Sequence, residues 1–119
     1  MPQYMLLIHA DPEKGPAQGS PEMEAQFAQW GEYTQRLTEA GVMRSGAPLQ
    51  APATATTVAQ RNGERLVTDG PFIETKEWLG GYYVVDVPDL DAAIDWAGQM
   101  PNISYGSVEV RPVMEIAGM

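Results

Sequence analysis

The chain has 119 residues and a mass of 13.0 kDa, which is the size of one ordinary domain, so we predict a single domain over residues 1–119. Sixteen acidic and seven basic side chains give a net charge of −9, which repels a phosphate backbone and argues against direct nucleic-acid binding. The sequence has no cysteine, no signal-peptide pattern and no apolar stretch of about 20 residues, so it predicts no disulfide, no membrane span and a cytoplasmic location.

The first third of the chain reads as a strand, a loop and a helix. Residues 4–9, YMLLIH, are too short for a helix and too apolar for a loop, and they predict a central strand. The Pro- and Gly-rich segment 10–21 is longer than a connection requires, so it is either a lid or an ordinary surface loop. Ser20 predicts the N-cap of a helix that ends near Ala40, before a capping Gly41. The expected buried stripe is Met23, Phe27, Trp30 and Leu37.

The remaining elements follow from turn signals and apolar runs. Residues 42–50 predict an irregular strand, and the Asn62-Gly63 turn predicts a hairpin over residues 53–70. Residues 81–87, GYYVVDV, predict another apolar strand, and residues 107–113 predict the last one. Between these two strands we expect a helix that begins at Pro88-Asp89 and stops before Pro101. Its expected buried face is Leu90, Ala93, Ile94 and Ala97.

This order of elements predicts an α+β fold, a ferredoxin-like antiparallel sheet with two helices on one face. The strands at 4–9 and 81–87 are apolar on both faces, yet two helices cover only one. At about 25 cal/mol per Å² of apolar surface, leaving the second face in water would forfeit several kcal/mol. We therefore predict a homodimer that joins two sheets face to face, a dimeric α/β barrel.

The turn Asp69-Gly70-Pro71 is the strongest candidate for a functional element. Asp can accept backbone N–H bonds, Gly permits a positive φ and Pro fixes its own φ, so the turn is expected to be rigid. A rigid turn that holds a carboxylate suits acid/base chemistry, and His9, the one histidine, lies at the end of the first strand. The candidate catalytic residues are Asp69 and His9. The alternative is structural: Asp69 caps its turn and His9 is a hydrogen-bonded interior residue.

The residues after the turn are candidates for ligand binding. Glu74 and Lys76 are expected near the mouth of the sheet, where they either contact a ligand or form a solvated ion pair. A glycine pair allows a bulge or the close approach of a ligand to the backbone. The predicted ligand-binding residues are Phe72, Glu74, Lys76, Gly80 and Gly81. With one histidine and no cysteine, we predict no metal site and no cofactor.

A resemblance to a known family adds to these expectations. DGPFIETKEWLGGYYVVDVPDLDAAIDWA at residues 69–97, followed by GSVEVRPV at 106–113, resembles the signature of the DGPF family, a branch of the YCII-related proteins. The similarity covers nearly the whole chain. It implies a dimeric α/β barrel like that of muconolactone isomerase and a bacterial origin. YCII relatives are suspected enzymes with a His–Asp pair in a cleft, and the motif aspartate is Asp69 here. The resemblance also implies that function is mostly unassigned and that members often accompany extracytoplasmic-function sigma factors.

Two functions are therefore expected. The first is a small-molecule-binding dimer, with a cleft between the sheet, the 10–21 loop and the 69–81 segment. If it is an enzyme, we expect isomerase- or lyase-like proton transfer beside a carbonyl, with Asp69 as base, His9 as its partner and Lys76 offsetting negative charge. The alternative is a non-catalytic regulatory protein that binds a sigma factor through its acidic surface.

Overall fold

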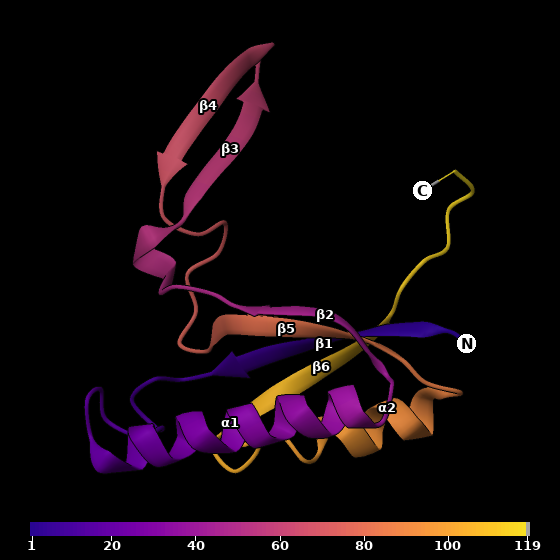
Figure 1. Ribbon diagram of the computed structural model, residues 1–119. Coiled ribbons are helices and arrows are strands. Elements are labelled where there is room, and N and C mark those ends of the chain that lie inside the picture. The colour runs from indigo at the N-terminus through magenta and orange to yellow at the C-terminus, as the bar shows by residue number, and fades with distance from the viewer. Residues whose placement is uncertain (119) are drawn as a thin grey trace.

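The computed structural model describes residues 1–118, which form one main sheet, two helices and a separate hairpin. The main sheet is antiparallel, with strand order β2-β5-β1-β6. Its strands are β1 (Gln3–Ala10), β2 (Met43–Pro48), β5 (Trp78–Asp86) and β6 (Gly106–Pro112). The helices α1 (Pro21–Glu39) and α2 (Leu90–Ala97) lie on one face of this sheet (Figure 1). The predicted α+β fold with two helices on one face is confirmed, and its strand order is that of a ferredoxin-like sandwich.

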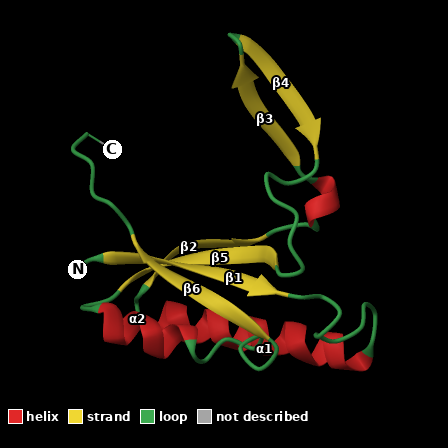
Figure 2. Cartoon of the chain, turned by 180° about the vertical axis from the view of Figure 1, so that it is seen from behind, coloured by secondary structure: helices red, strands yellow, loops and turns green. Residues whose placement is uncertain are grey.

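The predicted hairpin is also present, but it is not part of the main sheet. Strands β3 (Thr56–Arg61) and β4 (Glu64–Asp69) form a two-stranded sheet of their own after a short 3-10 helix, η1 (Pro52–Thr54). Asn62 and Gly63 at the turn have φ values of 53° and 79°, the left-handed geometry that a tight hairpin requires. The hairpin extends away from the sheet on the side opposite the helices (Figures 1 and 2).

Helix α1 begins and ends where the sequence predicts. The Ser20 hydroxyl accepts a hydrogen bond from the Met23 N–H, and Gly41 follows the helix with a φ of 73°. The buried stripe differs from the prediction, because Phe27 is 64% exposed whereas Tyr33 is fully buried. At about 100° per residue, these two side chains lie on opposite flanks of the stripe, and α2 packs on the flank of Tyr33.

Helix α2 also begins where the sequence predicts, but its buried face differs from the prediction. The Asp89 carboxylate accepts a hydrogen bond from the Ala92 N–H, so the predicted start is confirmed. Of the expected buried residues, Ala93 and Ala97 are buried, but Leu90 and Ile94 are about half exposed. The core cluster contains these two alanines together with Met100, which follows the helix, and Trp96 packs against it. Within residues 1–118, no helix combines the length and apolarity needed to span a membrane.

Tyr33 links both helices to the sheet at the centre of the core. Its hydroxyl donates a 2.7 Å hydrogen bond to the carbonyl of Trp96, at the end of α2. Its ring makes edge-on contacts with Trp30, Trp96 and Tyr83 of β5. Burial, and to a smaller degree the neighbouring Tyr83, raises the pKa of the Tyr33 phenol well above its ordinary value, so the hydroxyl remains a donor.

Replacing Tyr33 by Phe is expected to lower the free energy of unfolding at neutral pH by about 1 kcal/mol, because one buried hydrogen bond is lost. Stability of the wild type should also fall as the pH rises above 10.0, since the phenol then ionises in the unfolded chain but stays neutral in the core. Tyr33→Phe should show a shallower fall. Urea unfolding of both proteins at neutral pH and above pH 10.0 measures the two changes in stability. An equal pH dependence in the wild type and Tyr33→Phe would contradict the prediction.

Candidate functional site

The face of the main sheet opposite the helices is uncovered and mostly apolar at its centre. Met5 pairs with Val84 and Leu7 pairs with Tyr82, and these four half-buried residues, which we call the open face, alternate with core residues such as Leu6. The predicted alternation of β1 and β5, apolar on both sides, is confirmed. The open face is the side of the sheet on which the candidate residues His9 and Glu109 lie.

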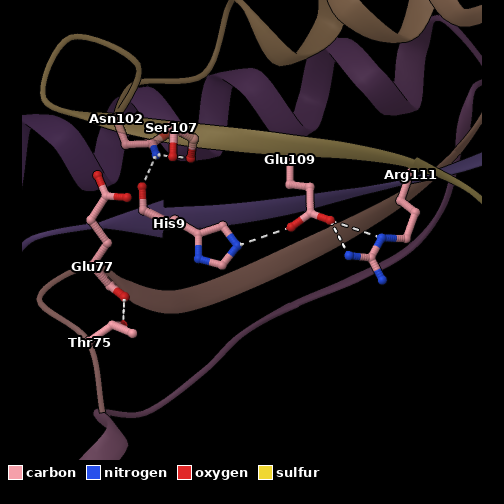
Figure 3. Close-up of polar contacts among 7 residues, drawn as sticks. All are labelled: His9, Thr75, Glu77, Asn102, Ser107, Glu109 and Arg111. Atoms are coloured by element: carbon pink, nitrogen blue, oxygen red, sulfur yellow. Dashed lines mark hydrogen bonds and ion pairs between the residues drawn. The ribbon is translucent and has the colours of Figure 1, made fainter. Parts of the chain in front are cut away.

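His9 lies at the end of β1 on this same side of the sheet. Its Nε2 atom is 3.8 Å from Oε1 of Glu109 on β6, and Figure 3 shows the ring and the carboxylate pointing toward each other. This separation is too long for a direct hydrogen bond but short enough for an ion pair when the imidazole is protonated. Glu109 also accepts a 2.9 Å hydrogen bond from Nε of Arg111. The carboxylate beside the ring therefore comes from β6.

The backbone of His9 is held firmly from the helix side. The buried Asn102 side chain donates hydrogen bonds to the carbonyls of His9, at 3.2 Å, and Ser107, at 3.3 Å. A Cβ at Gly106 would lie only 2.3 Å from the His9 carbonyl oxygen, so β6 can begin here only with glycine. These contacts fix the end of β1 against the start of β6 and thereby fix the position of the imidazole.

A cleft of about 940 Å³ opens beside His9. Its walls come from the segments 49–55 and 70–79, which connect the main sheet to the hairpin. Apolar side chains dominate the walls, and they include Leu49, Ile73, Trp78 and Leu79. A mainly apolar concave surface with a few polar groups is typical of small-molecule sites.

Asp69 lies just outside this cleft. It is exposed at the end of β4, opposite Thr56, and the next residue, Gly70, lines the cleft. Gly70 has a φ of 103°, as the turn predicted. The turn is fixed by backbone and hydroxyl contacts: the Gly70 N–H donates to the Ala55 carbonyl at 2.8 Å, and the Thr57 hydroxyl donates to the Gly70 carbonyl at 2.7 Å. Thr57 was not singled out from the sequence. The pairing of Asp69 with His9 stays a prediction.

The predicted ligand-binding side chains separate into two groups. Glu74 lines the cleft together with His9. Phe72, which is 83% exposed, and Lys76 belong to the same segment but lie outside the lining. Trp78, which is not among the predicted site residues, is 37% exposed and lines the cleft. It was missed because nothing local distinguishes a cleft tryptophan from a core one.

The glycine pair has a structural role. Ile8 pairs with Gly81 and His9 pairs with Leu79, so Gly80 is the extra residue of a bulge, one of the two alternatives expected from the sequence. A Cβ at Gly81 would lie 2.9 Å from the Ala47 carbonyl oxygen, so this glycine permits the close approach of β2. The bulge shifts the register immediately before His9.

The 10–21 loop lies away from the large cleft. The Asp11 carboxylate accepts a 2.9 Å hydrogen bond from the Glu13 N–H, and Gly15 packs against the Tyr105 ring. Residues of this loop, with Gly80, line a separate pocket of about 260 Å³. The large cleft is thus bounded by 49–55 rather than by the expected loop. Across residues 1–118, no three His, Asp or Glu side chains gather closely enough to hold a metal ion.

Changing Gly70 to Ala is expected to lower the free energy of unfolding by about 1 kcal/mol or more, because an L side chain is strained at a φ of 103°. Gly80→Ala is the matched control: neither Cβ would meet another atom within 4 Å, and Gly80 has no positive φ. Thermal or urea unfolding compares the two variants. Equal stability of both would show that the turn tolerates a side chain.

Comparison with known proteins places the whole chain in one family. A family model described as the YCII-related domain matches residues 2–117. An uncharacterized protein of Rhizobium meliloti (strain 1021) is 37% identical over 112 residues, which cover 92% of this chain and 90% of that protein. The family model spans the main sheet, the two helices and the hairpin. The chain therefore belongs to the YCII-related domain family.

Proposed function

We propose that this YCII-related chain is a cytoplasmic member of the DGPF branch and works as a homodimer that binds a small, mainly apolar molecule in the cleft beside His9. One observation carries the proposal: the single imidazole of the chain lines a mainly apolar cleft, with a carboxylate 3.8 Å from its Nε2 atom. An imidazole can accept and donate a proton through its ring nitrogens, and the apolar walls can hold a molecule against it.

The reaction that we propose is proton transfer beside a carbonyl group, as in isomerases or lyases. In an isomerisation, neutral His9 takes a proton from a carbon next to the carbonyl and returns it to another atom of the same molecule. In a lyase reaction, His9 gives that proton to the departing group as the bond to this group breaks. Neither reaction consumes another reactant. Glu109 stabilises the imidazolium that exists between the two steps, and Arg111 holds the Glu109 carboxylate in place. Asp69, at the edge of the cleft, is the candidate for a second base.

The homodimer is supported by the surface of the single chain. Its accessible area is 8362 Å², compared with about 6,300 Å² for a compact monomer of 13.0 kDa. The excess of about 2,000 Å² exceeds the roughly 800 Å² per partner that a standard interface buries. The apolar centre of the open face is available to such an interface, and joining two open faces would form the proposed α/β barrel.

A regulatory role is the second candidate function, and the uneven distribution of charge over the molecule supports it. The helix layer, which is residues 11–41 and 87–105, holds nine of the sixteen acidic side chains and two of the seven basic ones. A partner with a basic surface, such as an extracytoplasmic-function sigma factor, would be attracted to this layer. In that case the layer, rather than the cleft, would be the functional surface.

A metabolite-library thermal-shift screen, followed by turnover assays on the hits, tests the cleft. His9→Gln is expected to reduce turnover at least about tenfold with an unchanged melting temperature. Glu109→Gln should also lower turnover if Glu109 supports the imidazolium, whereas Asp69→Asn should do so only if Asp69 is a second base. Full turnover by His9→Gln would contradict the proposed chemistry. Binding of a sigma factor by a chain that binds no metabolite would support the regulatory role.

Leu7→Lys is expected to convert the dimer to a monomer at micromolar concentration, because it places a charge at the centre of the proposed interface. Ile94→Lys is the control, since Ile94 is 49% exposed on the helix side and should leave the dimer intact. Sedimentation velocity measures both. A monomeric wild type at the same concentration would refute the homodimer.

A further inference from the structure

The β3–β4 hairpin, residues 56–69, is an arm whose strands are largely exposed among residues 1–118. It extends from the sheet on the side of the open face (Figures 1 and 2). The radius of gyration is 16.4 Å, compared with about 13.5 Å for a compact domain of 119 residues. The core cluster contains no residue of the arm among the described residues. The arm is therefore not held by the core that stabilises the main sheet.

Only the base of the arm is firmly held. The Gly70 N–H donates to the Ala55 carbonyl and the Thr57 hydroxyl donates to the Gly70 carbonyl, so the direction in which the arm leaves the sheet is fixed. Beyond this base every residue of β4 is exposed. A two-stranded hairpin is marginally stable in water by itself. An arm with a fixed base and an uncovered body is suited to packing against another molecule.

One surface of the arm has the composition of an interface. Val58 and Val67 are directly opposite each other and are 64% and 57% exposed. The pairs on either side of them on this surface are polar, Thr56 with Asp69 and Gln60 with Arg65. An apolar centre with a polar rim is the usual arrangement at protein interfaces. The opposite surface carries Ala59 and Leu66, and Leu66 is less exposed, at 47%.

The charge of the chain indicates that the molecule packed against the arm is a second copy. Outside the helix layer the chain has seven acidic and five basic side chains, a net charge of −2, whereas the helix layer has −7. Two chains of charge −9 repel each other least when these nearly neutral sides meet. The arm itself is neutral, with Arg61 and Arg65 against Glu64 and Asp69.

We infer that the arm of each copy packs through Val58 and Val67 against the second copy, and that this second copy closes the cleft beside His9. The inference rests on the proposed homodimer and deepens it. The cleft walls, 49–55 and 70–79, are the two segments that join the arm to the sheet. A copy that lies on the open face and contacts the arm therefore also lies over the cleft. Each binding site is then built from both chains.

The first test changes the arm in the full-length protein. Val58→Lys/Val67→Lys is expected to weaken the dimer at least about tenfold, measured by sedimentation equilibrium. The matched control, Ala59→Lys/Leu66→Lys, adds the same charges to the opposite surface of the same strands and should change the dimer constant less than about threefold. Circular dichroism melting shows that both variants keep the fold. Unchanged dimerisation of Val58→Lys/Val67→Lys, or equal weakening by the two variants, would overturn the inference.

The second test asks whether the arm and the cleft become covered. Because the chain has no cysteine, Val67→Cys, Ile73→Cys and Ile94→Cys can each be labelled with one polarity-sensitive dye. Ile73 lines the cleft, and Ile94 lies on the helix side. The emission of the dye at positions 67 and 73 should shift to the blue at concentrations where the protein is a dimer and shift back on dilution. The emission of the dye at position 94 should not change. A constant signal at 67 or 73 would contradict the packed arm or the closed cleft.

The outcomes separate this inference from the homodimer on which it rests. If the wild type is a monomer, both are wrong. If the wild type is a dimer that Leu7→Lys disrupts while Val58→Lys/Val67→Lys leaves it unchanged, the homodimer stands and the packed arm is wrong. The dye at position 73 reports on the cleft without any ligand, so the test is independent of the identity of the bound molecule.

Discussion

The structure depends on one imbalance: the two central strands are apolar on both faces, and the chain supplies helices for only one of them. Leu6 and Val85 are completely buried under α1 and α2, while Leu7 and Val84, their immediate neighbours, lie on the open face. Burial of apolar surface is the main favourable term in folding, so the helix side forms a stable core with Tyr33 at its centre. The open face retains exposed apolar surface, and the candidate site lies on that side.

The position of His9 follows from how the strands end. The bulge at Gly80 shifts the register of β1 against β5 immediately before His9, and Gly106 lets β6 start in contact with the His9 carbonyl. Asn102 adds hydrogen bonds from the helix side. These contacts act on the backbone, and they hold the end of β1, on the open-face side of the sheet, in a fixed geometry. A cleft beside a rigid strand end is a more precise location for chemistry than a mobile loop.

The charged residues, like the apolar ones, are distributed differently on the two sides of the main sheet. The helix layer carries most of the net negative charge, and the sheet and arm are nearly neutral. The ion pairs on the open side, Arg44 with Asp86 and Glu109 with Arg111, lie on or next to edge strands, outside the apolar centre. Paired charges around an apolar centre cost less to bring near another surface than unpaired ones. In the proposed homodimer the acidic layer would face solvent, where its charge would repel other dimers.

Local signals in the sequence determined the boundaries of the elements. Ser20 and Asp89 cap their helices, and Asn62-Gly63 makes the hairpin turn, because each acts on backbone groups a few residues away. The double-sided apolar pattern of residues 4–9 also revealed the open face. Periodicity misplaced Phe27 and Ile94, because the buried flank of a helix depends on where the other helix packs.

The site shows the same division between local and tertiary information. The sequence singled out His9 as a candidate and allowed a positive φ at Gly70, because a lone imidazole and an Asp-Gly-Pro turn are visible in the chain itself. The alternation of β6 could have placed Glu109 on the open side, but its neighbour there depends on the pairing of β1 with β6, which joins residues 100 positions apart. Only the tertiary structure decided this contact, the cleft walls and the direction of the arm, because each arises from segments that meet only after the sheet has formed.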